Sequence, residues 1–257
     1  MIKLIASDVD GTVLKYTELE LNKTIFDMIG KLYEKGILFV AASGRPLCEL
    51  KYLFAPVADK MGFVCSDGAI TLIGSEVIDI NTIEKEAANE LIRDIYGYRD
   101  CEFLVYASDK AYTKPKTDTF RNMVKDILYG GDVIISQLSD ISEDYLKIAV
   151  YNEDGVENIE NYFLDKYAGK FEVTYAANKW IEFNAPQVSK AVGIEKLKER
   201  LGITTEECMA FGDSYNDLTM FESVGHSYAM STAKEIVKAN SKYVCDDVES
   251  TIRRILL

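Results

Sequence analysis

Three aspartates are the first candidates for chemistry in this sequence of 257 residues. Asp8 and Asp10 stand two positions apart after the apolar run 2–7, and Asp213 follows a second apolar run at 208–211. Carboxylate oxygens are hard ligands suited to Mg²⁺, which usually keeps several waters and takes another ligand from a substrate phosphate. Carboxylates crowded this closely would repel one another without a cation. The three aspartates therefore predict a magnesium site.

The same carboxylates meet the needs of phosphoryl transfer once Ser43 and Lys190 are added. One carboxylate could attack phosphorus and form an aspartyl-phosphate. A second could pass a proton to the leaving alcohol and later take one from water, a task with few other candidates because His226 is the single histidine. Ser43 and Lys190 supply a hydroxyl and a cation for the phosphoryl oxygens. Taken singly, each residue is typical of a turn, a helix cap or a surface charge, so the prediction rests on the combination.

The order of the expected elements brings these residues to one edge of a sheet. Short apolar runs at 2–7, 37–42, 63–65 and 208–211 predict buried strands that end in polar, Gly-bearing loops. Strands that alternate with helices in this way are typical of parallel β-α units, whose ligands bind at the carboxyl ends of the strands. We therefore expect an α/β fold: a Rossmann-like core with a central parallel sheet flanked by helices.

The pattern changes between residues 82 and 183, which predicts an inserted α+β domain with one sheet covered by helices on one face. The catalytic core is then discontinuous, made of residues 1–81 and 184–257. The elements expected in the insert are a helix at 83–96, strands at 102–107 and 110–113, a helix at 118–128, a strand at 145–151, a helix at 156–167, and strands at 171–175 and 180–183.

The charge and the cysteines limit the partners and the location. The chain has 29 Lys and Arg against 42 Asp and Glu, a net charge of −13 that disfavours nucleic acid and anionic membrane surfaces. A small phosphate ester stays possible where a bound cation inverts the local field. The 5 cysteines form no C-x-x-C pair, no stretch of about 18 apolar residues exists, and the first residues do not form a signal peptide. We expect a cytoplasmic protein; its oligomeric state is left open.

The sequence resembles the haloacid dehalogenase (HAD) superfamily of phosphohydrolases, specifically the Cof-like branch with a large α+β cap of class II, subtype B. The resemblance covers essentially the whole chain. Its carriers, in the order and spacing of the family, are Asp8-Val-Asp-Gly-Thr-Val-Leu14, Ser43-Gly-Arg-Pro46, Val188-Ser-Lys190 and Gly212-Asp-Ser-Tyr-Asn-Asp-Leu-Thr-Met220. By this resemblance the insert is the cap that selects the substrate.

The resemblance also implies how the aspartates divide the work. Asp8 would be the nucleophile and Asp10 the general acid and base. Mg²⁺ would be held by Asp8, by the backbone carbonyl of Asp10 and by Asp213.

The remaining motif residues would bind the phosphate or orient the others. Ser43, Gly44 and Lys190 would hold the phosphoryl group. Asn216 and Asp217 would orient Lys190 and the surroundings of the metal.

Some positions depart from the family's common pattern. Asp67 stands where Asn is usual, Ala191 follows Lys190 in place of the frequent Gly, and the segments 229–233 and 245–248 lack familiar residues. None of these differences falls on a catalytic, metal-binding or phosphate-binding position, so the expected class of reaction is unaffected. The identity of the substrate is left open. In the acidic insert, a basic cluster is formed by Lys110, Lys114 and Lys116. We favour the interpretation that these lysines lie on a solvated loop over the alternative that they contact the substrate. For Glu182 and Asn184, near the end of the insert, a structural role is likewise favoured.

We expect a Mg²⁺-dependent phosphatase for a small phosphorylated metabolite, a sugar phosphate above all. One alternative is a sugar phosphomutase of the same superfamily, which would return the phosphoryl group to a sugar. The other is a non-enzymatic, receiver-like phosphate-binding regulator. Receiver domains are about half this length and lack both the Asp-x-Asp-Gly-Thr run and a cap.

Overall fold

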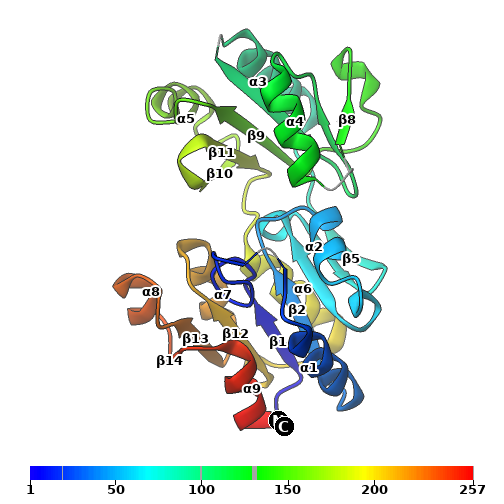
Figure 1. Cartoon of the computed structure of the whole chain (residues 1–257), viewed down its shortest axis with the longest axis vertical. Coiled ribbons are helices and arrows are strands. Elements are labelled where there is room, and N and C mark those ends of the chain that lie inside the picture. Colours follow the sequence, from blue (N-terminus) through cyan, green and yellow to red (C-terminus); the bar gives the residue numbers. More distant parts are fainter. Residues whose placement is uncertain (19, 99, 129–131, 257) are drawn as a thin grey trace. The chain divides into compact units, whose positions relative to one another are not determined.

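The computed structural model describes residues 1–18, 20–98, 100–128 and 132–256, which form two compact units (Figure 1). The first, which we call the core unit, contains residues 1–45, 50–79 and those from 189 onward. The second, which we call the inserted unit, contains residues 46–49 and 80–188.

In the described part of the core unit, eight strands form one sheet in the order β14-β13-β12-β1-β2-β3-β4-β5. The strands from β14 to β3 are parallel, and β4 runs antiparallel to β3. The expected α/β class is confirmed; the sequence did not predict β4 and β5 beyond β3, nor β13 and β14 at the other edge. The bounds are β1 (Leu4–Ser7), β2 (Leu38–Ala42), β3 (Gly62–Cys65), β4 (Ile70–Ile73), β5 (Glu76–Ile80), β12 (Cys208–Gly212), β13 (His226–Met230) and β14 (Tyr243–Cys245).

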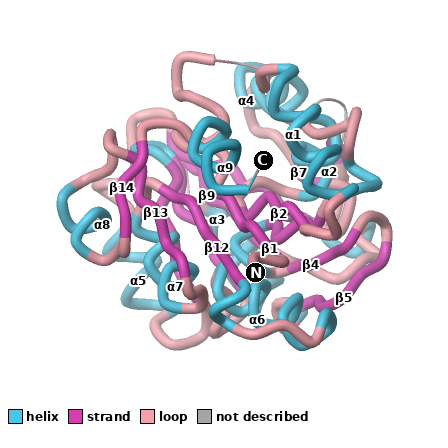
Figure 2. The backbone as a smooth tube through the Cα atoms, turned by 90° about the horizontal axis from the view of Figure 1, so that it is seen from below, coloured by secondary structure: helices cyan, strands magenta, loops and turns pink. Residues whose placement is uncertain are grey.

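Helices lie on both sides of the core sheet. α1 contacts α9, and α6 contacts α7; the two pairs lie on opposite sides of the strands in Figure 2. This burial on both faces explains why β1 and β12 are buried at every position and read as continuous apolar runs. The bounds are α1 (Lys23–Glu34), α2 (Leu47–Leu53), α6 (Lys190–Leu201), α7 (Leu218–Glu222), α8 (Glu235–Ala239) and α9 (Val248–Leu256).

The inserted unit has its own sheet, in the order β10-β11-β9-β6-β7-β8 over the described residues. The expected strands and helices are present, and one further strand, β8, was not predicted. The bounds are α3 (Lys85–Gly97), β6 (Cys101–Tyr106), β7 (Ala111–Thr113), α4 (Asp118–Ile127), β8 (Asp132–Ile134), β9 (Lys147–Asn152), α5 (Glu160–Tyr167), β10 (Glu172–Ala176) and β11 (Trp180–Asn184).

Helices contact both faces of this second sheet, so the expectation of helices on one face was wrong. Phe120 of α4 clusters with Leu104 of β6, whereas Tyr96 of α3 packs edge-on against Phe103 of the same strand. Successive residues of a strand point to opposite faces, so the two helices lie on different sides of β6. All six residues of β6 are buried, as this arrangement requires.

Over the described residues, no helix is both long and apolar enough to cross a membrane.

Gly68 allows a close approach of backbone segments, and its replacement gives a test of the core fold. Its φ is +105°, and an added Cβ would lie 2.2 Å from the carbonyl oxygen of Ser189, directly before α6. We expect Gly68→Ala to lower the free energy of unfolding by about 2 kcal/mol or more. The control is Gly30→Ala in α1, where an added Cβ meets nothing within 4 Å and should stabilise by about 0.5–1 kcal/mol. Urea unfolding of both variants measures the difference; equal midpoints would contradict it.

Candidate active site

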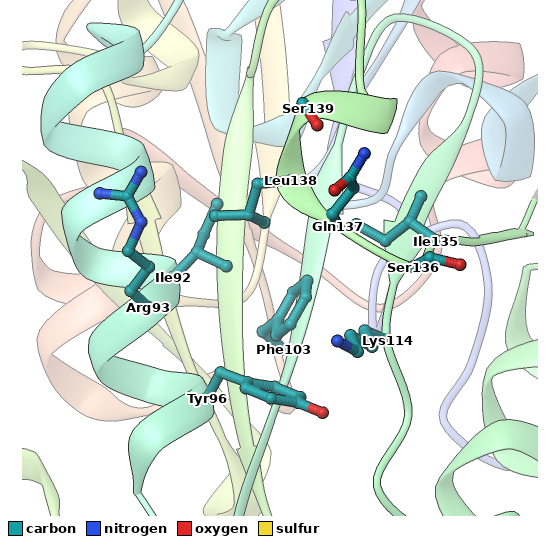
Figure 3. A pocket seen from close by; sticks show the side chains of 10 residues that line it. All are labelled: Ile92, Arg93, Tyr96, Phe103, Lys114, Ile135, Ser136, Gln137, Leu138 and Ser139. Carbon is teal, nitrogen blue, oxygen red and sulfur yellow. The ribbon is translucent and has the colours of Figure 1, made fainter.

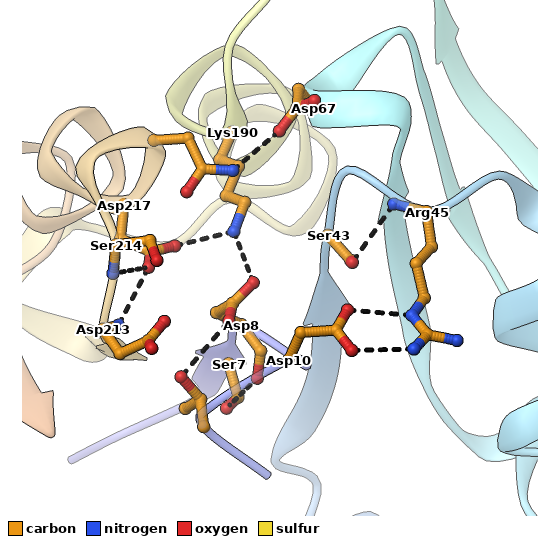
Figure 4. Close-up of polar contacts among 12 residues, drawn as sticks. Ser7, Asp8, Asp10, Ser43, Arg45, Asp67, Lys190, Asp213, Ser214 and Asp217 are labelled. Carbon is orange, nitrogen blue, oxygen red and sulfur yellow. Dashed lines mark hydrogen bonds and ion pairs between the residues drawn. The ribbon is translucent and has the colours of Figure 1, made fainter. Parts of the chain in front are cut away.

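Three predicted residues follow three neighbouring strands of the core sheet (Figure 4). Asp8 follows β1, Ser43 follows β2 and Asp213 follows β12, and β1 pairs in parallel with both of the other strands. Because parallel strands end at the same edge of a sheet, the three side chains collect there. The backbone N–H of Asp8 donates to the carbonyl of Phe211 at 2.9 Å, so the pairing continues up to the aspartate.

The ammonium group of Lys190 joins two of the carboxylates. Its Nζ lies 2.6 Å from Oδ1 of Asp8 and 2.7 Å from Oδ1 of Asp217. The side chains of Lys190 and Asp217 are fully buried. Lys190 is the first residue of α6, which begins at the N-cap Ser189, so the start of this helix positions the cation.

Asp217 organises the loop after β12. Its Oδ2 accepts hydrogen bonds from the backbone N–H groups of Asp213 and Ser214, each at 2.9 Å. Gly212 lies so close that an added Cβ would be 2.4 Å from Cγ of Asp217. Lys190 and the two N–H groups therefore engage both oxygens of Asp217, which suits a positioning role.

Asp213 and Asp8 retain oxygen atoms that a cation could use. Oxygens of Asp8, Asp213 and Asp217 lie within 4.8 Å of one another, a spacing that could hold a metal ion. Oδ2 of Asp213 accepts from the Tyr16 hydroxyl at 3.0 Å, while Oδ1 is buried with no partner among the described residues. Thr12 donates to Oδ2 of Asp8 at a longer 3.2 Å. A buried carboxylate oxygen without a partner fits a hard divalent cation.

The pKa values at this site reflect an excess of negative charge. Burial raises the pKa of Asp8 to about 8; Lys190 opposes this rise, and Asp217 adds to it. Burial also raises the pKa of Asp213, with a further contribution from Asp217. For Lys190, burial alone would lower the pKa, but the carboxylates of Asp217 and Asp8 outweigh it and raise the pKa. One lysine does not balance these carboxylates, which again favours a bound cation.

Arg45 holds the carboxyl group of Asp10, which lies on the opposite side of Asp8 from Asp213 in Figure 4. Nε of Arg45 lies 2.8 Å from Oδ2 of Asp10, and one terminal nitrogen of the guanidinium lies 2.7 Å from Oδ1. The backbone N–H of Arg45 also donates to Oγ of Ser43 at 3.2 Å. The two-point contact orients the carboxyl group of Asp10 next to the Ser43 loop.

Asn216, which the family resemblance expects to orient Lys190 and the surroundings of the metal, contacts a third residue. Its Nδ2 donates to Oδ1 of Asp67 at 2.9 Å. Asp67 is buried, adopts a left-handed backbone with φ of +58°, and lies next to Gly44, where an added Cβ would be 3.1 Å from its Oδ2. The negative charge of Asp67 contributes to the raised pKa of Lys190, so Asn216 binds a carboxylate that acts on the lysine.

Sequence reasoning did not assign roles to Thr12, Tyr16 or Arg45. Thr12 and Arg45 lie within the motifs at 8–14 and 43–46, so these motifs were a signal that could have identified them. The contact of Tyr16 with Asp213 joins residues 197 positions apart, and no local pattern predicts it.

Comparison with known proteins now identifies the family. The model of the haloacid dehalogenase-like hydrolases matches residues 5–251, and the chain belongs to this family. It is 30% identical over 253 residues to a Bacillus subtilis protein and 26% identical over 243 residues to an Escherichia coli protein, covering 95% and 94% of this chain and 90% of each relative. Both relatives are named 5-amino-6-(5-phospho-D-ribitylamino)uracil phosphatases.

A solved structure shares the fold. It is a sugar phosphatase of HAD subclass IIB, 21% identical, with a TM-score of 0.82 over 98% of both chains. At that identity the likeness concerns the fold alone. The resemblance to Cof-like HAD phosphatases is confirmed, and phosphoric monoester hydrolase, the expected class of enzyme, is the class that the relatives' names support.

The raised pKa values predict how Mg²⁺ should affect stability. Asp8 and Asp213 bind protons more tightly in the folded than in the unfolded chain, so without a cation stability falls as the pH rises from about 4 to about 8. Mg²⁺ at 10 mM should therefore raise Tm by a few degrees at pH 8 and by less at pH 5, where protons compete with it.

Thermal unfolding at the two pH values, with and without MgCl₂, measures this effect. Asp213→Asn should lose the Mg²⁺ response, and Asp59→Asn, at an exposed position of the core unit, should keep it. An equal response in Asp213→Asn and the unaltered chain would contradict the assignment of Asp213.

Proposed function

We propose that this enzyme is a Mg²⁺-dependent phosphatase that hydrolyses small phosphate monoesters through an aspartyl-phosphate on Asp8. The observation that carries the proposal is the buried Asp8 carboxylate, held by Lys190 at the carboxyl end of β1 and next to Asp213. Asp10 stands two residues away, fixed by Arg45. A fixed carboxylate beside a buried cation is suited to attack on phosphorus.

In the first step, an oxygen of Asp8 forms a bond to phosphorus as the bond from phosphorus to the ester oxygen breaks. Asp10, in its protonated form, gives its proton to the leaving oxygen. In the second step, a water attacks the phosphorus of the aspartyl-phosphate and Asp10 takes a proton from that water. The bond between Asp8 and phosphorus breaks, which releases phosphate and restores both aspartates.

The other residues would bind the phosphoryl group and keep it in line with Asp8. Ser43, Gly44 and Lys190 would contact its oxygens. Asp8, the backbone carbonyl of Asp10, and Asp213 would hold Mg²⁺. When bound, the ion would neutralise phosphate charge and polarise the phosphoryl oxygens. Asp217 would keep Lys190 and the Asp213 loop in place, as its contacts support.

The proposed substrates are phosphate esters of sugars or sugar alcohols. The two relatives named above are phosphatases for a compound that carries its phosphate on a ribityl chain. The net charge of −13 disfavours nucleic acid and anionic membranes as partners, and we infer that the enzyme acts on a soluble metabolite in the cytoplasm.

We propose that the inserted unit, whose main segment 80–188 contains the predicted insert 82–183, selects the alcohol part of the substrate. A buried polar group on its sheet supports this role. Nζ of Lys147 lies 2.8 Å from Oε1 of Glu182 and 5.1 Å from the ring centre of Tyr106. Asn184 pairs with Lys147 across β11 and β9, and its fully buried amide has no hydrogen-bond partner among the described residues. A buried amide of this kind requires a water or a ligand as its hydrogen-bond partner.

Asp8→Asn should reduce hydrolysis of p-nitrophenyl phosphate by at least about 10³-fold, because the amide cannot form the phosphorylated intermediate. Asp10→Ala should slow both steps, and Asp59→Asn should leave turnover unchanged. Released phosphate measures activity, and circular dichroism checks that each variant folds. Near-normal activity of Asp8→Asn would refute the mechanism.

A second experiment distinguishes a phosphatase from a mutase. With an activated sugar phosphate, isomerisation in place of free phosphate would identify a mutase.

Asn184→Leu tests the proposed selection, since leucine has nearly the shape of asparagine. Removing a buried amide without a partner should raise the free energy of unfolding by about 1 kcal/mol. The same change should lower kcat/KM for the best sugar phosphate about tenfold and leave p-nitrophenyl phosphate, which lacks hydroxyl groups, unaffected.

The matched control is Asn152→Leu on the same sheet. The side chain of Asn152 accepts from the backbone N–H of Asp154 at 2.9 Å, so its loss should destabilise the fold without changing substrate preference. If Asn184→Leu left the preference among substrates intact, its amide would have no part in selection.

A further inference from the structure

The inserted unit contains a cavity that none of the proposed catalytic residues lines. It has a volume of about 410 Å³ and lies among α3, β6 and the segment that follows β8 (Figure 3). The volume falls within the range of pockets for small molecules, roughly 300–1,000 Å³.

Apolar and aromatic side chains form much of the lining. They include Ile92 of α3, Phe103 of β6, and Ile135 and Leu138 of the segment after β8. The ring of Tyr96 packs edge-on against Phe103, with 6.1 Å between centroids and an angle of 74°. This surface is suited to a flat apolar group.

Two cations complete the lining. Arg93 reaches the cavity from α3 and Lys114 from the segment after β7, on opposite sides of Phe103 in Figure 3. Nζ of Lys114 lies 5.1 Å from the ring centre of Tyr96, and Nζ of Lys116 lies at the same distance from that ring. Lys116 is held separately by the carbonyls of Tyr98 and Cys101, so of these two lysines only Lys114 lines the cavity.

These cations stand out because the surrounding unit is acidic. Most of the negative surplus of the chain lies between residues 82 and 183, yet no Asp or Glu is among the lining residues. Within the described part of the chain, neither Arg93 nor Lys114 forms an ion pair; the salt bridges of the region involve other residues, such as Lys110 with Glu143. Asp140, just outside the lining, is close enough to Lys114 for the two charges to interact without forming an ion pair. Both cations can still bind an anion in the cavity.

The polar rim of the cavity is held in place by the backbone. The N–H groups of Ser136 and Gln137 both donate to Oδ2 of Asp140 at 3.0 Å. The N–H of Ile135 donates to the carbonyl of Thr113 at 2.9 Å. The rim is therefore formed before any ligand arrives, which lowers the cost of binding.

We propose that this cavity is a second ligand site, for a small organic anion that carries an aromatic ring. The ring would lie against Phe103 and Tyr96, and the anionic group would be bound by Arg93 and Lys114. The assignment rests on an apolar floor, two cations without an ion pair among the described residues, and a lining that contains no carboxylate. The site lies wholly within the inserted unit and does not depend on the proposed catalytic mechanism.

The probe is 2-naphthalenesulfonate, which is aromatic, anionic and not a phosphate ester. Titration into the ¹⁵N-labelled full chain should shift the amide signals of residues 92–96, 103, 114 and 135–139, with a dissociation constant of about 1 mM or tighter. Methanesulfonate lacks the ring and 2-naphthalenemethanol lacks the charge, so each should bind at least about tenfold more weakly.

Arg93→Gln and Lys114→Gln should each weaken binding about tenfold, because each removes one charge-assisted contact. The matched controls are Arg121→Gln and Lys125→Gln, exposed residues of α4 that do not line the cavity. Binding with normal affinity in the Arg93→Gln/Lys114→Gln double variant would overturn the proposal. So would amide shifts confined to other residues, or equal affinity for the uncharged naphthalene compound.

Discussion

The buried ammonium group of Lys190 holds together parts of the chain that are far apart in sequence. It contacts Asp8, 182 residues away, and Asp217, 27 residues away, and it does so without access to water. Removing one partner of such a pair costs about 3–5 kcal/mol, because the remaining charge is left buried and unpaired. The strand end at Asp8, the start of α6 and the Asp217 loop are therefore coupled. The contacts that stabilise the core unit at this edge are also those that shape the proposed catalytic centre.

The sequence could predict the strand ends but not the contacts between side chains. Asp8, Ser43 and Asp213 were expected at one edge because short apolar runs imply buried parallel strands, whose carboxyl ends meet. The pairing of Asp10 with Arg45 depends on side-chain conformation, which hydrophobic patterning does not encode. Asn216 was expected to orient Lys190 and the surroundings of the metal, and it contacts Asp67, one of the positions at which this chain departs from the common pattern of the family. The carboxylate of Asp67 accepts a hydrogen bond from the amide of Asn216, a contact that the sequence pattern did not reveal.

In the inserted unit, the sequence contained a sign that the sheet is covered on both faces, and the prediction did not use it. Its central strands, β6 and β9, are buried at every position and do not alternate between apolar and polar residues. Such runs indicate cover on both faces of a sheet, which the contacts of α3 and α4 with β6 bear out. Lys147 interrupts this apolar environment and is stabilised there by Glu182 and the ring of Tyr106.

Because β1 pairs with β12, the site can form only late in the synthesis of the chain. Leu4 pairs with Cys208, and the whole inserted unit lies between them in the chain. A ribosome that adds roughly 5–20 residues per second needs about 10–40 s to cover that interval. For most of this time Asp8 and β2 have been made, but neither β12 nor the Lys190 that contacts Asp8 exists. The inserted unit can fold within this interval, because its sheet contains no strand from outside it. The nucleophile is among the first residues translated, yet its site is one of the last parts of the molecule to form.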